Sequence, residues 1–153
     1  EQANRIPILI VAPGVAKGGS VTRQLAETVD IYPTVAELAG LPVPKGPQSI
    51  DGKSLVPVLK NPKARVRDHA FHAYPRRRLG RAIRTERYRL VEWRNPGEPV
   101  NKAEYELYDY SKGSVETVNL AKKKPALVKE LATTLAKYPE PVSRGGRKPK
   151  KNK

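Results

Sequence analysis

The segment 72–78, which reads HAYPRRR, carries the side chains of this chain that are best suited to bind an anion. A strand is expected to end at Tyr74, and Pro75 then turns the chain into a loop. Guanidinium groups on such a loop present forked donors that match the oxygens of a sulfate, a carboxylate or a phosphate. A solvated loop without a binding role is the competing interpretation. The candidate anion-binding residues are His72, Tyr74, Arg76, Arg77 and Arg78.

Other kinds of active site find little support in the sequence. The chain has no cysteine, which excludes a thiolate nucleophile and a cysteine-based metal site. Asp68, His69 and His72 could suggest a metal cluster, but neighbours on a strand point to opposite faces, so His69 faces away from His72. No serine stands in a Gly-x-Ser-x-Gly elbow, and residues 14–19 lack the ending of a phosphate-binding loop. The residues therefore supply no complete active site.

The chain of 153 residues carries a formal net charge of +15, and the charge is unevenly distributed. Residues 60–94 hold 12 basic and three acidic side chains, and residues 143–153 add six basic side chains and no acidic one. Such a positive field favours a polyanionic partner, whether nucleic acid, a sulfated polysaccharide or an anionic membrane. Four arginines are expected on the solvated face of a sheet, with anion binding as the competing interpretation: Arg81, Arg84, Arg87 and Arg89. The basic tail is either plainly solvated or a tether for a polyanion.

Residues 1–60 are expected to form the C-terminal end of an α/β domain. The nearly continuous apolar run over 6–12 predicts a strand that is covered on both faces, as in a parallel sheet. Asp30 is expected to cap a helix that runs to Ala39 and ends at Gly40, with Ile31, Val35 and Leu38 on one face. Residues 54–59 predict one more helical turn.

The neighbours that a doubly covered strand needs are scarce in this chain. The chain also begins with Glu1 rather than with methionine. We therefore expect it to be the C-terminal part of a longer protein and to be poorly stable when it is expressed alone.

Residues 61–142 are expected to form a small α+β subdomain. Runs rich in aromatic and β-branched residues, mixed with Arg and Glu, predict an antiparallel sheet with one solvated face. A helix is predicted from Pro125 to about Tyr138, with Leu127, Leu131 and Leu135 in its apolar stripe. Residues 143–153 are expected to be a disordered basic tail. The predicted strands cover residues 70–74, 81–85, 88–93 and 104–110.

Several stretches in order resemble the C-terminal part of type I sulfatases, from residue 1 to about residue 139. They read RIPILIVAPG, VDIYPTVAELAGLPVP, DGKSLVPVL and YELYDY with ETVNLA, and HAYPR with GRAIRTERYRLVEW is most similar to the iduronate-2-sulfatase branch. The loop over 111–115 departs from the acidic Asp-Pro turn that is usual in the family. The resemblance implies an α/β, alkaline-phosphatase-like fold: the end of the large domain, then a four-stranded antiparallel sheet with one packed helix.

The same resemblance implies a sulfuric ester hydrolase that acts on sulfated glycans. The family's nucleophile is a formylglycine made within a Cys/Ser-x-Pro-x-Arg motif, and a bound Ca²⁺ polarises the sulfate. No serine here stands in that motif, so no catalytic and no metal-binding residue is carried over, and the segment alone should be inactive. On the substrate side, His72, Tyr74, Arg76 and Arg77 become candidate contacts to a uronate carboxylate or to neighbouring sulfates.

The resemblance also implies partners and a location. The expected partners are the preceding catalytic region of the same polypeptide and a sulfated glycan, in a periplasmic or secreted enzyme whose signal peptide is not part of this segment. No run approaches the ~20 apolar residues of a membrane span, so no membrane partner is expected. The alternative is a free-standing basic module that binds nucleic acid or another polyanion, with Tyr and Trp stacking on bases. A decayed sulfatase remnant is a third interpretation.

Overall fold

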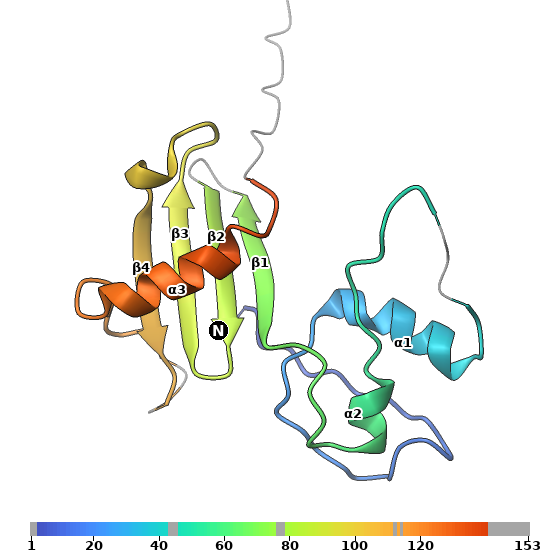
Figure 1. Ribbon diagram of the computed structural model, residues 1–153. Coiled ribbons are helices and arrows are strands. Elements are labelled where there is room, and N and C mark those ends of the chain that lie inside the picture. The colour runs from blue at the N-terminus through green and yellow to red at the C-terminus, as the bar shows by residue number, and fades with distance from the viewer. Residues whose placement is uncertain (1–2, 43–45, 76–78, 112, 114, 141–153) are drawn as a thin grey trace, which may run out of the picture. The chain divides into compact units, whose positions relative to one another are not determined.

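The computed structural model describes residues 3–42, 46–75, 79–111, 113 and 115–140 (Figure 1). The chain divides into two compact units, one made of Glu1–Ala70 with Arg84–Arg87 and the other of Phe71–Ile83 with Tyr88–Lys153. The predicted basic tail over 143–153 lies outside the described residues. None of the helices in the described ranges has the length and apolar character needed to cross a bilayer.

The first unit contains three short helical elements, of which the sequence predicts the last two. They are η1 (Thr28–Asp30), α1 (Ile31–Leu38) and α2 (Val56–Lys60). Gly40 ends α1 as expected, because its φ of +68° lies in the left-handed region that glycine adopts without a steric penalty. The Leu41 amide then donates to the Ala36 carbonyl at 2.9 Å, which closes the end of the helix.

Asp30 is the fully buried centre of the first unit, with 0% of its surface exposed. Its carboxylate accepts hydrogen bonds from the backbone amides of Glu27 and Lys53, each at 2.8 Å. Two guanidinium nitrogens of Arg67 complete the shell, Nε at 3.1 Å and Nη2 on the other oxygen. The expectation that Asp30 caps α1 is wrong, because its oxygens are taken by these donors and none caps the helix.

Thr34 and Gly52 lay the segment before α2 against the start of α1. The Thr34 hydroxyl donates to the Asp30 carbonyl at 2.6 Å and accepts from the Leu55 amide at 2.8 Å. Gly52 approaches so closely that a Cβ atom there would stand 2.0 Å from the Val29 carbonyl oxygen. Only glycine fits this approach, so the segment is held by shape as well as by hydrogen bonds.

The first unit also exposes a large apolar surface. Residues 6–12 form neither a helix nor a strand, so the predicted doubly covered strand is not formed within this chain. Leu9 is 86% exposed and Val11 is 91% exposed. In α1 the buried side chains are those of Pro33, Thr34 and Ala36, whereas Ile31 and Val35 of the predicted apolar stripe are exposed and Leu38 is half-buried. A strand forms only with a hydrogen-bonding neighbour, and the described part of this chain offers the run none.

The second unit is built on the four-stranded sheet that the sequence predicts. The strands are neighbours in chain order, and Figure 1 shows consecutive strands running in opposite directions. The register of the last pair sets Leu90 opposite Leu107 and Val91 opposite Glu106. The element η2 (Val100–Lys102) precedes the last strand. The strands are β1 (His69–Pro75), β2 (Leu79–Thr85), β3 (Tyr88–Arg94) and β4 (Glu104–Asp109).

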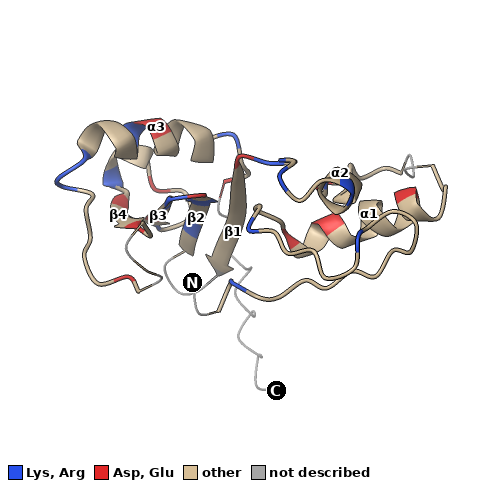
Figure 2. Ribbon diagram, turned by 90° about the horizontal axis from the view of Figure 1, so that it is seen from below, with Lys and Arg blue, Asp and Glu red and all other residues tan. Residues whose placement is uncertain are grey.

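The helix α3 (Pro125–Leu135) covers one face of this sheet, as Figure 2 shows from below. Leu90, Leu107 and Leu131 form a buried cluster between the two layers. The helix begins at Pro125 as expected but ends before Tyr138, whose ring instead stacks on Phe71 with centroids 4.2 Å apart. The apolar stripe of α3 therefore packs on the sheet as the sequence predicts.

A buried ion pair lies on the same face of the sheet. Arg81 and Glu92 are each 3% exposed, and Nη2 of the arginine lies 2.7 Å from Oε1 of the carboxylate. Arg81 also donates to the carbonyls of Tyr138 and Pro139, the latter at 2.9 Å. The expectation that Arg81 lies on a solvated face is wrong, since this side chain holds the segment after α3 against the sheet.

We expect Arg67→Ala to lower the free energy of unfolding of the first unit by about 3–5 kcal/mol, because it leaves the buried Asp30 carboxylate without its cation. The matched control is Arg65→Ala, since Arg65 pairs with Glu86 across side chains that are 51% and 80% exposed. That exposed pair should contribute only about 0–1 kcal/mol. Urea unfolding of the intact protein, followed by limited proteolysis within residues 1–70, compares the two. Equal losses in both variants would contradict the role given to Asp30.

Candidate functional site

The face of the sheet opposite α3, called here the second face, carries several polar side chains of β3 and β4. Because Leu90 and Leu107 face the helix, strand alternation places Arg89 and Val91 on the second face. Arg89 stands opposite Tyr108 in the register of the last two strands. This face therefore holds the half-buried groups that could meet a polar ligand.

The central strand β2 contributes small residues to the second face. A Cβ atom on Gly80 would stand 2.8 Å from the indole ring of Trp93, so the ring lies directly against the backbone there. Ala82, two residues further on, is 1% exposed. Because these residues are small, side chains of β1 and β3 can meet across the strand that separates them.

His72 of β1 and Arg89 of β3 meet in this way. The imidazole is half-buried, and its Nε2 lies 3.1 Å from Nη2 of the guanidinium. A guanidinium can only donate, so Nε2 must be the acceptor and the neutral ring carries its proton on Nδ1. Burial and the charge of Arg89 lower the pKa of His72 to about 4, against an opposing effect of Glu116. The ring is therefore neutral at physiological pH.

Arg89 is held in place by a carboxylate and a phenol. Its Nη1 pairs with Oε1 of Glu116, and the Tyr110 hydroxyl donates to the same oxygen. The side chains of Arg89 and Glu116 are only 15% and 28% exposed. Burial alone would raise the pKa of Glu116, but the hydrogen bond from Tyr110 and the charge of Arg89 hold that pKa below its usual value. Glu116 is thus ionised, and it fixes the guanidinium beside His72.

The structure describes two of the predicted site residues, His72 and Tyr74. Tyr74 shares the face of His72 by strand alternation and is 46% exposed. Arg76 and Arg77 lie outside the described residues, as does Arg78. The structure therefore brings His72 together with Arg89, Tyr110 and Glu116.

From the sequence, Arg89 is expected on a solvated face, with anion binding as the alternative, and no role is predicted for Tyr110 or Glu116. Their association depends on how the chain after β4 folds back, and no sequence spacing shows this. The one available signal was the alternation that puts Arg89 and Tyr108 on the face away from Leu90 and Leu107.

The described residues offer no fit to a metal ion. They contain no group of three or more His, Cys, Asp or Glu side chains that could hold one. His69 has a pKa below its usual value because of burial, although the charge of Asp68 opposes the shift. Asp68 itself is solvated, with 84% of its side chain exposed and Arg65 at 3.6 Å.

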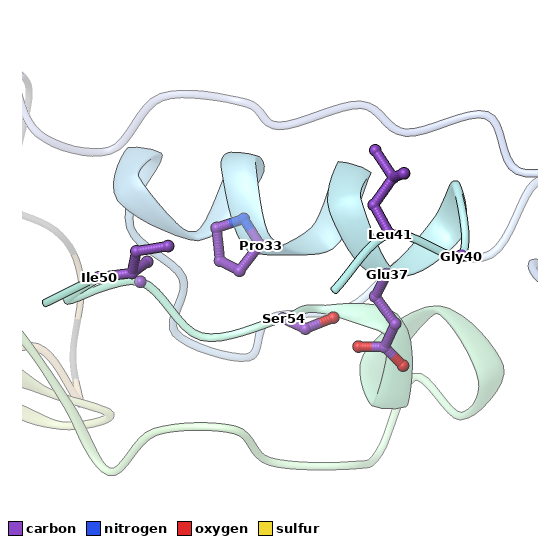
Figure 3. A pocket seen from close by; sticks show the side chains of 7 residues that line it. Pro33, Glu37, Gly40, Leu41, Ile50 and Ser54 are labelled. Carbon is purple, nitrogen blue, oxygen red and sulfur yellow. The ribbon is translucent and has the colours of Figure 1, made fainter. Parts of the chain in front are cut away.

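A separate cavity of about 500 Å³ lies within the first unit, between α1 and the segment that carries Ile50 and Ser54 (Figure 3). Its walls are mainly apolar, and the ionisable side chain among its lining residues is that of Glu37. A carboxylate in an apolar wall repels a sulfated or phosphorylated ligand. This cavity is therefore a poor candidate for an anionic ligand.

Comparison with known proteins gives consistent matches along the chain. A family model described as N-sulphoglucosamine sulphohydrolase, C-terminal, matches residues 1–140. An N-acetylglucosamine-6-O-sulfatase of Bacteroides thetaiotaomicron is 30% identical over an alignment of 155 residues, gaps included. The alignment covers 90% of this chain and 26% of that protein. The chain thus spans about a quarter of the length of this curated relative.

Solved structures agree with the sequence matches. BT4656, solved in complex with its substrate D-glucosamine-2-N,6-O-disulfate, superposes with a TM-score of 0.67 at 28% identity, over 82% of this chain and 26% of that one. BT1596, described as a 2-O GAG sulfatase, gives a TM-score of 0.56 at 28% identity, over 71% of this chain and 23% of that one.

We expect the structure to lose stability between pH 6.5 and about pH 4 through His72. The unfolded imidazole takes up a proton near pH 6.5, whereas the folded one has a pKa of about 4, so acid favours the unfolded chain across that window. The measurement is the difference in Tm between the intact protein and its His72→Gln variant from pH 7 to pH 4. As pH falls, the Tm of the parent should decrease relative to the Tm of His72→Gln. A difference in Tm that is independent of pH would refute a buried neutral His72.

Proposed function

The chain belongs to the sulfatases, as a member of the N-sulphoglucosamine sulphohydrolase C-terminal family, and we propose that it is the C-terminal region of a longer enzyme that hydrolyses sulfate esters on sulfated glycans. The observation that carries the proposal is the match over residues 1–140 by a chain that spans about a quarter of its curated relatives. The activity is proposed for the whole protein, and this segment alone should not cleave sulfate esters.

The catalytic groups are proposed to come from the region that precedes this segment. The family resemblance implies a formylglycine nucleophile and a Ca²⁺ ion that polarises the sulfate ester. Neither fits the residues of this segment, which has no cysteine, no serine in a Ser-x-Pro-x-Arg motif and, among its described residues, no metal-binding group. We propose that the enzyme acts in the periplasm or outside the cell, where its polymeric substrates occur.

The first role proposed for this segment is to complete the catalytic fold. Leu9 and Val11 are almost fully exposed, and the apolar stripe of α1 faces outward with Ile31 at 43% and Val35 at 57%. Burying such side chains stabilises a fold by about 1.5–3 kcal/mol each. The preceding region is the proposed neighbour of both surfaces, with residues 6–12 becoming a strand of its sheet.

The second proposed role is to line the substrate pocket with His72, Tyr74, Arg76 and Arg77. His72 and Tyr74 share one face of β1, and the arginines follow directly in the chain. A neutral imidazole and a phenol can orient an anionic sugar by hydrogen bonds, while guanidinium groups bind carboxylate or sulfate oxygens by charge-assisted bonds. The net charge of +15 would further attract a polyanionic glycan.

The sulfate position that the enzyme cleaves is a finer proposal. The sequence resemblance favours an iduronate-2-sulfatase-like specificity, and BT1596 is described as a 2-O GAG sulfatase. The relative from B. thetaiotaomicron is named for the 6-O position instead. Sulfate release from a 2-O-sulfated uronate disaccharide, compared with D-glucosamine-2-N,6-O-disulfate, decides between the two positions. Release from neither substrate by the intact enzyme would count against a glycan sulfatase.

In the intact enzyme, Arg76→Ala and Arg77→Ala should raise KM for the cleaved disaccharide more than they lower kcat. Contacts to parts of the substrate away from the reacting bond act alike on the ground state and the transition state. A lost charge-assisted hydrogen bond corresponds to roughly a tenfold rise in KM. The matched control is Lys129→Ala on the exposed side of α3, which removes the same charge elsewhere. Equal effects of all three variants would reduce the role of the arginines to general attraction.

The fold-completing role predicts that Val11→Lys sharply lowers the soluble yield and the Tm of the intact enzyme, because it places a charge where an apolar contact is proposed. Val100→Lys is the control, since Val100 is 55% exposed on η2 and has no proposed neighbour. Thermal unfolding of both purified variants measures the difference. Equal tolerance of lysine at both positions would contradict burial of residues 6–12 against the preceding region.

A further inference from the structure

Arg89 lies beside a proposed substrate-binding residue, and its surroundings determine how that residue can bind. The two terminal nitrogens of the guanidinium have different partners. Nη1 pairs with the Glu116 carboxylate, and Nη2 lies 3.1 Å from Nε2 of His72. Glu116 also accepts the Tyr110 hydroxyl on the same oxygen. The four side chains come from β1, from β3 and from the chain after β4, so their meeting depends on the folded sheet.

We propose that Arg89 is a positioning residue that holds His72 as a neutral imidazole with its proton on Nδ1, so that the ring faces the substrate as a neutral group rather than as a charge. This inference rests on the proposed function, because it takes His72 as a substrate contact. The role is distinct from that of the arginines after Pro75, which would supply charge. The proposed anchor of Arg89 is the Glu116 carboxylate, held in turn by Tyr110.

The chemistry of the contact supports this assignment. A guanidinium has no acceptor, so a ring nitrogen 3.1 Å from it must present a lone pair. Protonation of His72 would place an N–H group against another N–H group and a positive charge against a positive charge. Among the described residues, the ionised groups that act on the imidazole are Arg89 and Glu116, which are themselves paired. The Tyr110 phenol stays neutral, since burial and Glu116 raise its pKa.

A neutral His72 ring has a functional consequence for the binding of an anionic substrate. Its contribution to binding does not change between roughly pH 5 and pH 8, the range in which an ordinary histidine gains or loses its charge. An unrestrained histidine at the same place would bind a sulfate or carboxylate more tightly in acid than at neutral pH. Arg89 would thus make the affinity of this part of the pocket independent of pH.

The test uses the intact enzyme with ¹⁵N-labelled histidine, in which the His72 signals are assigned by comparison with His72→Gln. We expect the parent to show Nδ1 protonated, Nε2 unprotonated and no titration from about pH 5 to pH 8. In Arg89→Met the signals should titrate near the ordinary value of about 6.5. Arg89→Lys, which keeps a cation and a donor, should restore the neutral ring in part. Arg65→Met, which removes an exposed arginine, should leave the His72 signals unchanged.

Kinetics of the same variants give the second measurement, with the 2-O-sulfated uronate disaccharide or D-glucosamine-2-N,6-O-disulfate as substrate. KM of Arg89→Met, divided by that of the parent at each pH, should fall by about fivefold from neutral to acid pH, because the ring then gains a charge that attracts the anionic substrate. Because Arg89→Met removes the cation beside Glu116 and could weaken the fold, the double variant Arg89→Met/Glu116→Gln repeats the measurement without that charge.

The outcomes separate the two proposals. A His72 that titrates near pH 6.5 in the parent, or that carries its proton on Nε2, overturns the inference about Arg89 even if His72→Gln raises KM. The expected spectra, combined with an unchanged KM in His72→Gln, overturn the pocket role of His72 and leave the held imidazole as a structural feature alone.

Discussion

A buried carboxylate can persist only if its charge is paired and its oxygens are hydrogen-bonded, and this constraint organises the first unit. Asp30 gathers the backbone of Glu27, the backbone of Lys53 and the guanidinium of Arg67 around one side chain. These partners come from three separate stretches of chain, so the short helices are fixed by one polar centre. The second unit also contains a buried ion pair, formed by Arg81 and Glu92. Arg81 in addition holds the segment after α3 on the sheet.

The elements of the fold could be predicted from the sequence because their signals are local. As expected, α3 begins at Pro125 and α1 ends before Gly40. The four strands also form where runs of aromatic and β-branched residues predict them. The polar centres could not be predicted in this way. Asp30 before a helix has the pattern of a cap, and Arg81 within a basic strand has the pattern of a solvated side chain. What decides both cases is a partner 37 or 11 residues away in the sequence, which appears only after folding.

The candidate site shows the same limit. The prediction that the segment after β1 binds an anion follows from residue types alone, whereas the state of His72 does not. An imidazole on a strand can be charged or neutral, and the choice here depends on Arg89, which reaches it across a strand with small residues. Arg89 in turn depends on Glu116, contributed by the chain beyond β4. Sequence reasoning can name the residue that touches a ligand more readily than the residues that set its protonation.

The two units differ in how far each can stand alone, and this difference bears on the role of the segment. The second unit buries its own apolar side chains, since Leu90, Leu107 and Leu135 are fully covered between the sheet and α3. The first unit satisfies its polar centre but leaves much of its apolar surface in solvent, including the outward stripe of α1. The polar centre around Asp30 fixes the conformation of the first unit, while its apolar surface stays exposed. Such a unit is preorganised to pack against another apolar protein surface. Under the proposed function, the first unit docks against the preceding region through this surface, and the second unit carries the proposed substrate-binding residues.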